Sequence, residues 1–343
     1  METPKIIGLQ KLNEQWTTES PFISVTYHKD MYPPGTDQQG VEEKWLEGRD
    51  LGEDFKLKDG FRMYHGKTVP GFPVHPHKGF ETVTIILKGV IDHFDSKGSS
   101  CRYADGDVQW LTTGRGYQHS EMFPLVNEDG PNPLEMFQIW LNLDRKGKRT
   151  DPEYKMFWRE DIPVIENHFN GKKTIVKIIA GELYGIHSLE PNPASWAKDK
   201  NHHVGIYLIH MEPGATFTIP KGSGTMNRNL YFYEGDTIQL EGVTIKSNYR
   251  CKLVGDEEIV IVNGEQNSSI LILEGEPINE PVAQFGPFVM NTKEEIYNTF
   301  AEYNKTKFGG WKWDRPDPVN DRNAGRFVKY PDGRIEEPGA GTN

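Results

Sequence analysis

The stretch ETVTIILKGVIDHFDS, residues 81–96, indicates the fold class of this 343-residue chain. β-Branched and aromatic residues run on both sides of a Lys-Gly pair, which is typical of two short strands joined by a tight turn. Short strands with a turn signal every ten or so residues predict an all-β fold built from antiparallel β-sandwiches or jelly rolls. Similar runs occur at GDVQWLTT (106–113), EMFQIWLNL (135–143), KTIVKIIAGEL (173–183) and between residues 204 and 275.

The two halves of the chain repeat this pattern. RNLYFYEGDTIQLEG (228–242) in the second half reads as strand, glycine turn and strand, as the opening stretch does in the first half. We therefore predict a duplicated β-sandwich followed by a helix and a tail. The predicted division is an N-terminal domain over 1–165 with a polar insertion at about 31–56, a second domain over 166–290, a helix over 291–310 and a tail over 311–343.

One segment, NTKEEIYNTFAEYNKTKFGG (291–310), is predicted to be a helix. Thr292 is placed to cap its first turn, with Glu295 three residues further on, and Gly309 is expected to end it. An apolar stripe predicts that one face packs on a sandwich, through Ile296, Phe300 and Tyr303. The last ten residues of the chain are predicted to be disordered, as chain termini often are.

Charge and cysteine content exclude several classes of protein. The formal net charge of −11 and the pI near 5.5 argue against a nucleic-acid-binding face. Two cysteines, Cys101 and Cys251, are too few for a disulfide framework or a cysteine-rich zinc site. The start of the sequence lacks an apolar signal region, and no apolar run approaches the roughly 18 residues that cross a bilayer. We therefore predict a cytoplasmic protein that binds neither nucleic acid nor membrane.

Two histidines in FPVHPHKGFETVT (72–84) are candidate metal ligands. On an extended backbone His75 and His77 point to the same face, so both imidazoles can reach one point. Pro76 fixes its own φ and favours extended geometry at His75. A histidine pair of this kind is weak evidence by itself, and ordinary loop histidines are the alternative.

A second pair follows in TTGRGYQHSEMF (112–123), where His119 and Glu121 are again two residues apart. Two such pairs on two strands of one sandwich can face each other across its interior. Together they supply three imidazoles and one carboxylate. This mixed set suits a first-row divalent metal with open positions, whereas a structural zinc site is more often closed by four ligands that include thiolates.

The motifs HPHKGFETVT, GDVQWLTTGRGYQHSEM and QIWLNL resemble those of the pirin family of bicupins, proteins with two cupin domains. IIAGELYG and GEPINEPVAQFGPFVMNTKEEI resemble its second half, so the resemblance covers roughly residues 60–310. It implies that a non-haem Fe(II) is bound in the N-terminal cupin. Glu81, the carboxylate that cupins use more generally, is left as a neighbour of the metal, and Lys78 stands where the family has arginine. The implied ligands are His75, His77, His119 and Glu121.

The second cupin is expected to lack a metal. Its corresponding stretch, PKGSGTMNRNLYFYEG (220–235), contains no histidine. His202, His203 and His210 precede this stretch, but none belongs to a paired pattern with a carboxylate. His202 and His203 are interpreted as loop residues, and this half of the chain as a scaffold or an interaction surface.

The resemblance implies an enzyme of the quercetin 2,3-dioxygenase type. Such an enzyme opens the central ring of a flavonol with O2 and releases carbon monoxide. A phenolic substrate and O2 would be its partners, and Glu121 would be the catalytic general base as well as a ligand. The alternative is an iron-dependent, redox-sensing regulatory protein that binds a protein partner without robust catalysis. An inactive structural protein is the third reading.

Overall fold

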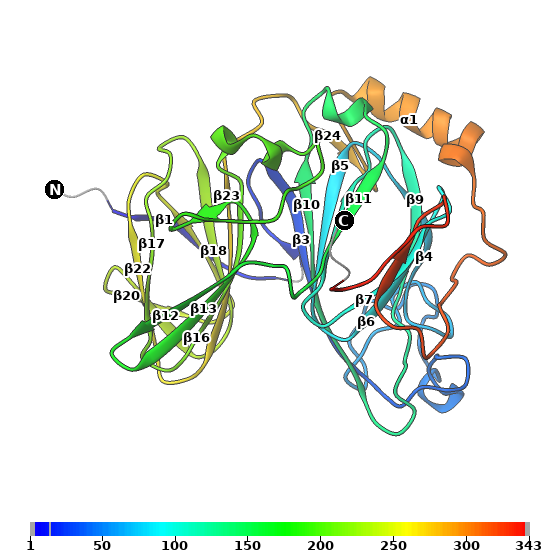
Figure 1. Cartoon of the computed structure of the whole chain (residues 1–343), viewed down its shortest axis with the longest axis horizontal. Coiled ribbons are helices and arrows are strands. Elements are labelled where there is room, and N and C mark those ends of the chain that lie inside the picture. Colours follow the sequence, from blue (N-terminus) through cyan, green and yellow to red (C-terminus); the bar gives the residue numbers. More distant parts are fainter. Residues whose placement is uncertain (1–3, 14, 340–343) are drawn as a thin grey trace. The chain divides into compact units, whose positions relative to one another are not determined.

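The structure of the chain is a computed structural model that describes residues 4–13 and 15–339. Its regular secondary structure is mostly antiparallel strands (Figure 1), which confirms the predicted all-β fold. The chain folds into two compact units. The N-terminal cupin comprises Tyr27–Gln138, Arg145–Glu160 and the residues from Glu280 on. The C-terminal cupin comprises the residues up to Thr26, Ile139–Asp144 and Asp161–Asn279.

Two six-stranded sheets contain most strands of the N-terminal cupin, and a buried cluster that includes Ile86, Leu111 and Phe123 forms its core. Two strands of the first sheet, β3 and β10, continue into residues of the C-terminal cupin, to which β2 also belongs. The first sheet has the order β11 (Glu153–Phe157), β8 (Val108–Thr112), β5 (Phe80–Lys88), β10 (Asn132–Asn142), β3 (Phe22–Tyr32), β2 (Gln15–Trp16). The second has the order β27 (Ile335–Glu336), β26 (Phe327–Lys329), β7 (Ser100–Ala104), β6 (Val90–Asp95), β9 (Tyr117–Met122), β4 (Gly71–His77).

The C-terminal cupin has a seven-stranded and a four-stranded sheet around a core of aliphatic and aromatic side chains. The larger sheet has the order β1 (Ile6–Lys11), β21 (Tyr249–Leu253), β18 (Asn227–Glu234), β23 (Ser268–Gly275), β16 (Gly205–Met211), β13 (Lys172–Ala180), β12 (Val164–Phe169). The smaller sheet has the order β17 (Thr216–Ile219), β22 (Ile259–Asn263), β19 (Thr237–Leu240), β20 (Val243–Lys246).

The strand pairing confirms the duplication predicted from the two halves. In the N-terminal cupin β5 pairs with β8, β4 with β9, and β6 with both β7 and β9. The C-terminal cupin repeats these pairs in the same chain order as β18 with β21, β17 with β22, and β19 with both β20 and β22. Positions of the two units can therefore be compared strand by strand.

Short elements complete the chain. Two hairpins of two or three residues per strand are formed by β14 (Glu182–Leu183) with β15 (Ile186–His187) and by β24 (Ala283–Phe285) with β25 (Phe288–Met290). Single 3-10 turns lie at η1 (Glu43–Trp45), η2 (Gly147–Arg149), η3 (Trp196–Lys198), η4 (Lys200–His202) and η5 (Lys307–Gly309).

The predicted helix is α1, Lys293–Thr306. Its capping box is formed as expected, because Thr292 Oγ1 accepts from the Glu295 N–H and the Glu295 carboxylate accepts from the Thr292 N–H. The helix ends before Gly309, because Lys307 already adopts a left-handed conformation at φ 47°. Among the described residues, no helix is long and apolar enough to cross a membrane.

The apolar face of α1 packs on the hairpin of β24 and β25 within the N-terminal cupin. Phe300 packs edge to face against Phe288, with 4.9 Å between the ring centroids. At the other end of the stripe, the Tyr303 hydroxyl donates to Gln118 Oε1 at 2.9 Å. Gln118 lies on β9, so the helix is bound directly to one of the two strands that carry the candidate ligands.

The tail also belongs to the N-terminal cupin. Its strand β26 pairs with β7 and extends the second sheet. The prediction that the last ten residues are disordered is wrong at Ile335 and Glu336, which form β27. A local contact explains this order, because the Tyr330 hydroxyl donates to the Glu336 carboxylate at 2.8 Å. Residues 340–343 lie outside the described part of the chain.

The polar insertion at about 31–56 folds around one arginine. The Arg49 guanidinium donates to the Asp54 carboxylate at 2.9 Å and to the backbone carbonyls of Lys58 and Phe61 at 2.7 and 3.1 Å. Its side chain is fully buried. In this polar segment the charged Arg49 side chain thus holds the loop together through its hydrogen bonds.

Candidate metal centre

The structure brings together the three histidines that the sequence singled out. Strands β4 and β9 are antiparallel neighbours (Figure 1), and His75 lies directly opposite His119. His77 follows two residues later on the same face of β4. One nitrogen from each of the three imidazoles lies within 4.8 Å of the other two. No other cluster of potential metal ligands of this kind occurs in residues 4–13 and 15–339.

A bulge in β4 sets the positions of His75 and His77. The register with β9 shifts between Phe72 and His75, so that Pro73 and Val74 are left out of the ladder. Pro73 has no N–H to donate, and the Val74 N–H donates to the Pro316 carbonyl of the tail at 2.7 Å. Because β4 is the edge strand of its sheet, this contact with the tail also covers an otherwise open backbone edge.

The hydrogen bonds of His75 and His119 leave a nitrogen lone pair available on each ring. His75 Nδ1 lies 2.9 Å from the Pro73 carbonyl, which can only accept, so Nδ1 carries the proton and Nε2 is free to bind a metal. His119 Nε2 is fully buried and has no hydrogen-bond partner among the described residues. A buried nitrogen without a partner is costly unless something else satisfies it, and a metal ion would do so.

Burial keeps the three imidazoles in their neutral form. It lowers the pKa of His75 to about 4, a hydrogen bond to Pro73 opposing the shift only in part. Burial, together with the neighbouring imidazoles, lowers the pKa of His77 and of His119 well below the usual value. Neutral imidazole is the form that binds metal ions. The residues therefore fit a divalent metal.

Glu121 lies beside the three-histidine cluster rather than within it. Its Oε2 atom is 3.7 Å from His119 Nε2 and accepts a hydrogen bond from Gln138 Nε2 at 2.8 Å. Thr84 Oγ1 is 3.4 Å from its other oxygen. Burial raises the pKa of Glu121, although His93, Gln138 and Thr84 lower it in part. The carboxyl group is thus held by neutral donors next to the site.

The carboxylate expected to be a mere neighbour, Glu81, points to other partners. Its Oε1 atom accepts hydrogen bonds from Trp110 Nε1 at 3.0 Å and from Thr112 Oγ1 at 2.6 Å. These contacts tie β5 to β8 inside the first sheet. Lys78, at the position where the resembling family has arginine, pairs with Glu302 of α1 at 2.5 Å. In these contacts neither Glu81 nor Lys78 reaches the histidine cluster, whose side chains come from β4 and β9.

One buried histidine that contacts the site, His93, was missed by sequence reasoning. His93 Nδ1 lies 3.3 Å from His119 Nδ1, on the side of the His119 ring away from its free Nε2. The other nitrogen, His93 Nε2, lies 3.3 Å from the Tyr117 hydroxyl oxygen and 3.6 Å from Asp95 Oδ2. The signal was present, because His93 and Asp95 repeat the spacing of two residues seen in the other two pairs.

The protons in this chain of contacts can be placed from Asp95. Burial alone would raise its pKa, but hydrogen bonds from His93 and Tyr117 and from the Ser99 N–H outweigh it, so the pKa lies below the usual value. Asp95 is therefore a carboxylate, and Tyr117 donates its proton to Asp95 at 2.5 Å. With a neutral His93 that carries its proton on Nε2, His93 Nδ1 would accept from His119 Nδ1–H, and the lone pair of His119 would be left on Nε2.

Replacing His93 by phenylalanine should weaken metal binding about 10–100-fold, because His119 then loses the acceptor that fixes its tautomer and ring orientation. Competition with a chromophoric chelator would measure the affinity, and the absorption spectrum of the Co(II) form would report altered ligand geometry. Tyr154→Phe is the control, since the Tyr154 ring packs against His93 at 5.4 Å. Equal affinities in wild type and His93→Phe would contradict the role given to His93.

The C-terminal cupin has apolar side chains where the N-terminal cupin has its histidines. His77 ends β4 as Ile219 ends β17, and the pairing of His75 with His119 corresponds to that of Phe217 with Ile261. Phe217, Ile219 and Ile261 are all buried in the core of their unit. Their side chains offer no ligand atom. His202 and His203 lie at the turn η4 and its C-cap, as the loop interpretation expected.

Comparisons with known proteins also find two cupin domains in this chain. The family model of pirin matches residues 36–141, and the model of the pirin C-terminal cupin domain matches residues 206–309. A pirin-like protein of Solanum lycopersicum is 36% identical over 70% of this chain and 77% of its own length. Pirin of Homo sapiens is 34% identical over 75% of this chain and 83% of its own length. The crystal structure of a quercetin 2,3-dioxygenase from Acinetobacter baumannii superposes with a TM-score of 0.69 at 27% identity, covering 90% of this chain and 99% of that one.

Proposed function

This chain belongs to the pirin family, and we propose that it is an Fe(II)-dependent dioxygenase that opens the ring of quercetin-type flavonols with O2. The observation that carries the proposal is the cluster of three neutral imidazoles on β4 and β9. The likeness to a quercetin 2,3-dioxygenase of known structure supports the choice of reaction. The proposed partners are therefore a phenolic small molecule and O2.

Three residues would hold the iron, and they leave part of its coordination shell open. His75 and His119 would bind through Nε2, since the opposite nitrogen of each ring is engaged in a hydrogen bond. His77 completes the set. When bound, a divalent metal supplies Lewis acidity, which lowers the pKa of a coordinated hydroxyl, and a template that orients the reactants.

Glu121 is the group proposed to take the proton from the flavonol hydroxyl. Its carboxylate lies 3.7 Å from His119 Nε2, so a substrate oxygen at the cluster would lie near it. Burial raises the pKa of Glu121, which makes it a stronger base than an exposed carboxylate. Gln138 Nε2 donates to Oε2 and so orients the carboxylate that would receive the proton. A further role of Glu121 as fourth ligand is part of the same proposal.

Protein reconstituted with Fe(II) without oxygen should consume O2 when quercetin is added. Glu121→Gln should lower the rate of ring opening about 10²–10⁴-fold, the usual contribution of general acid–base catalysis, while three histidines still retain iron. Oxygen uptake, quercetin absorbance and iron content would be measured together. Glu153→Gln, at an exposed position on β11, is the matched control and should keep the activity of the wild type.

Two outcomes would change the assignment. Stoichiometric iron with no oxygen uptake would overturn the dioxygenase and favour the alternative, an iron-dependent regulatory protein that binds a partner. Full activity in Glu121→Gln would leave the dioxygenase in place and remove Glu121 as its base.

A further inference from the structure

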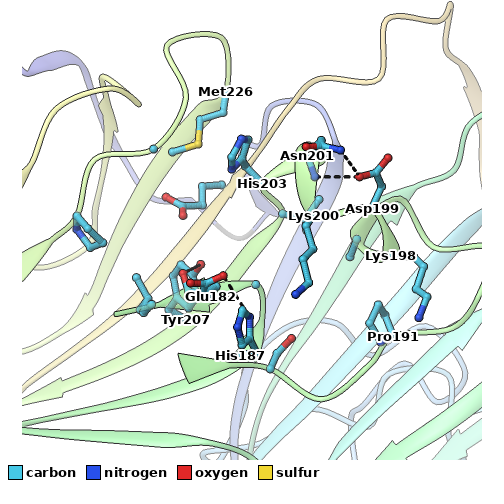
Figure 2. A pocket seen from close by; sticks show the side chains of 18 of the residues that line it. Glu182, His187, Pro191, Lys198, Asp199, Lys200, Asn201, His203, Tyr207 and Met226 are labelled. Carbon is cyan, nitrogen blue, oxygen red and sulfur yellow. Dashed lines mark hydrogen bonds and ion pairs between the residues drawn. The ribbon is translucent and has the colours of Figure 1, made fainter. Parts of the chain in front are cut away.

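The C-terminal cupin contains a cavity of about 470 Å³ that is separate from the histidine cluster (Figure 2). All of its walls come from one unit, residues 181–274. The loop between β13 and β16 forms one side, and the ends of β16, β18 and β23 form the other. A cavity of this size falls within the range of small-molecule sites.

A buried ion pair is part of the wall of this cavity. Arg228 Nε donates to Glu274 Oε2 at 2.6 Å, and the two side chains are only 2% and 8% exposed. The guanidinium also donates to the Pro220 carbonyl at 2.9 Å, so it is fixed in place. Burial raises the pKa of Glu274, although Arg228 lowers it in part. Buried charges are costly unless they are paired and hydrogen-bonded, as both are here.

Every carboxylate in the walls already has a donor within the same walls. Glu274 is paired with Arg228, Glu190 with Lys198, and the Glu182 carboxylate lies 3.2 Å from His187 Nδ1. The remaining acid is Asp199. Its Oδ1 atom accepts two hydrogen bonds at 2.9 Å, one from the backbone N–H and one from the side-chain amide of Asn201. The acidic groups are therefore engaged and offer little to a cationic ligand.

Two lysines in the walls are different. In the part of the chain that the structure describes, the ammonium groups of Lys200 and Lys221 have no hydrogen-bond or ion-pair partner. Figure 2 shows the Lys200 side chain extending across the cavity toward His187. The same cavity is also lined by apolar side chains, namely Leu183, Val204 and Met226, all buried.

We propose that this cavity binds a small organic monocarboxylate with an apolar aromatic or aliphatic body. Lys200 and Lys221 would neutralise the carboxylate, and Leu183, Val204 and Met226 would contact the body. The engaged acids disfavour cationic ligands, and the two free ammonium groups favour an anion over a neutral molecule. The proposal does not depend on the dioxygenase activity or on a bound metal.

The test uses isothermal titration calorimetry of the full chain freed of metal by a chelator, with benzoate as the probe. Benzoate should bind in the wild type, and benzamide, its neutral counterpart of the same shape, should bind at least about tenfold more weakly. Acetate, which has the carboxylate but no body, should also bind more weakly. In the double variant Lys200→Gln/Lys221→Gln the affinity for benzoate should fall at least about tenfold. Lys246→Gln, on β20 and outside the cavity, should leave it unchanged.

Three results would overturn the proposal. Benzoate could fail to bind the wild type, bind the double variant as tightly as the wild type, or bind no more tightly than benzamide. Because both lysines are exposed, the double variant is expected to fold normally, and an unchanged circular dichroism spectrum and melting temperature would establish this. Repeating the titration in His119→Ala should give the wild-type affinity, since the histidine cluster takes no part.

Discussion

In the variant His119→Ala, stoichiometric metal binding is expected to disappear. Three imidazoles would form the proposed site, and His119 is the one that faces the other two from the neighbouring strand. Without it, His75 and His77 remain as a pair on one strand, which is a weak site by comparison. Metal content after reconstitution with Fe(II) and dialysis would be measured by elemental analysis, and oxygen uptake with quercetin should be lost in parallel.

Metal binding should also be visible in the stability of the protein. A ligand that binds only the folded state stabilises it by about 2.7 kcal/mol at 100 times its Kd, so wild type should melt at a higher temperature when metal is added. In His119→Ala this increase should vanish. His210→Ala is the control, since this histidine lies on β16 of the C-terminal cupin and contacts Ser269. Unchanged metal content in His119→Ala would contradict the proposed site altogether.

The strand pattern and the histidine pairs could be predicted from the sequence because both depend on local geometry. Alternation along a strand places His75 and His77 on one face, whatever the rest of the fold does. The facing pair, His119 and Glu121, required only the assumption that two strands of one sandwich meet. The register places His119 opposite His75, and Glu121 opposite Phe72 on the other side of the bulge at Pro73 and Val74.

The remaining features depend on contacts between residues that are far apart in the sequence. The Val74 N–H is bound by Pro316, and Arg102 donates to the backbone carbonyls of Asp321 and Ala324. No local pattern in the sequence of the tail indicates these contacts. That the tail covers β4 and β7 could therefore not be predicted. His93 differs, because its spacing from Asp95 could be read from the sequence, whereas its contact with His119 could not.

The tight turn after HPH explains a motif residue that sequence reasoning left without a role. Gly79 has φ +90°, in the region that favours glycine, and it joins β4 to β5. A Cβ built there would lie 1.9 Å from the Val289 carbonyl oxygen. The hairpin of β24 and β25 is hydrogen-bonded to the same turn, with Val289 N–H donating to the Lys78 carbonyl at 2.9 Å. A side chain at position 79 would therefore fit only if the hairpin moved.

Gly79→Ala is accordingly expected to lower the free energy of unfolding by about 3–5 kcal/mol, the range of the most damaging single substitutions. About 1 kcal/mol of this comes from the left-handed backbone, and the rest from displacing β25. Metal affinity should also fall at least about tenfold, since His77 lies two residues before the turn. Urea unfolding and chelator competition would measure both effects.

The variant Gly333→Ala separates the cost of the left-handed backbone from the cost of displacing β25. Gly333 has φ +86°, nearly the same backbone conformation, but nothing lies within 4 Å of a Cβ built there. It should cost only the backbone strain of about 1 kcal/mol and leave metal affinity unchanged. If the two alanine variants were equally stable, the close approach of Val289 would not be what requires glycine after the second histidine. If Gly79→Ala were destabilised but bound metal with wild-type affinity, the turn would support the fold without positioning His77.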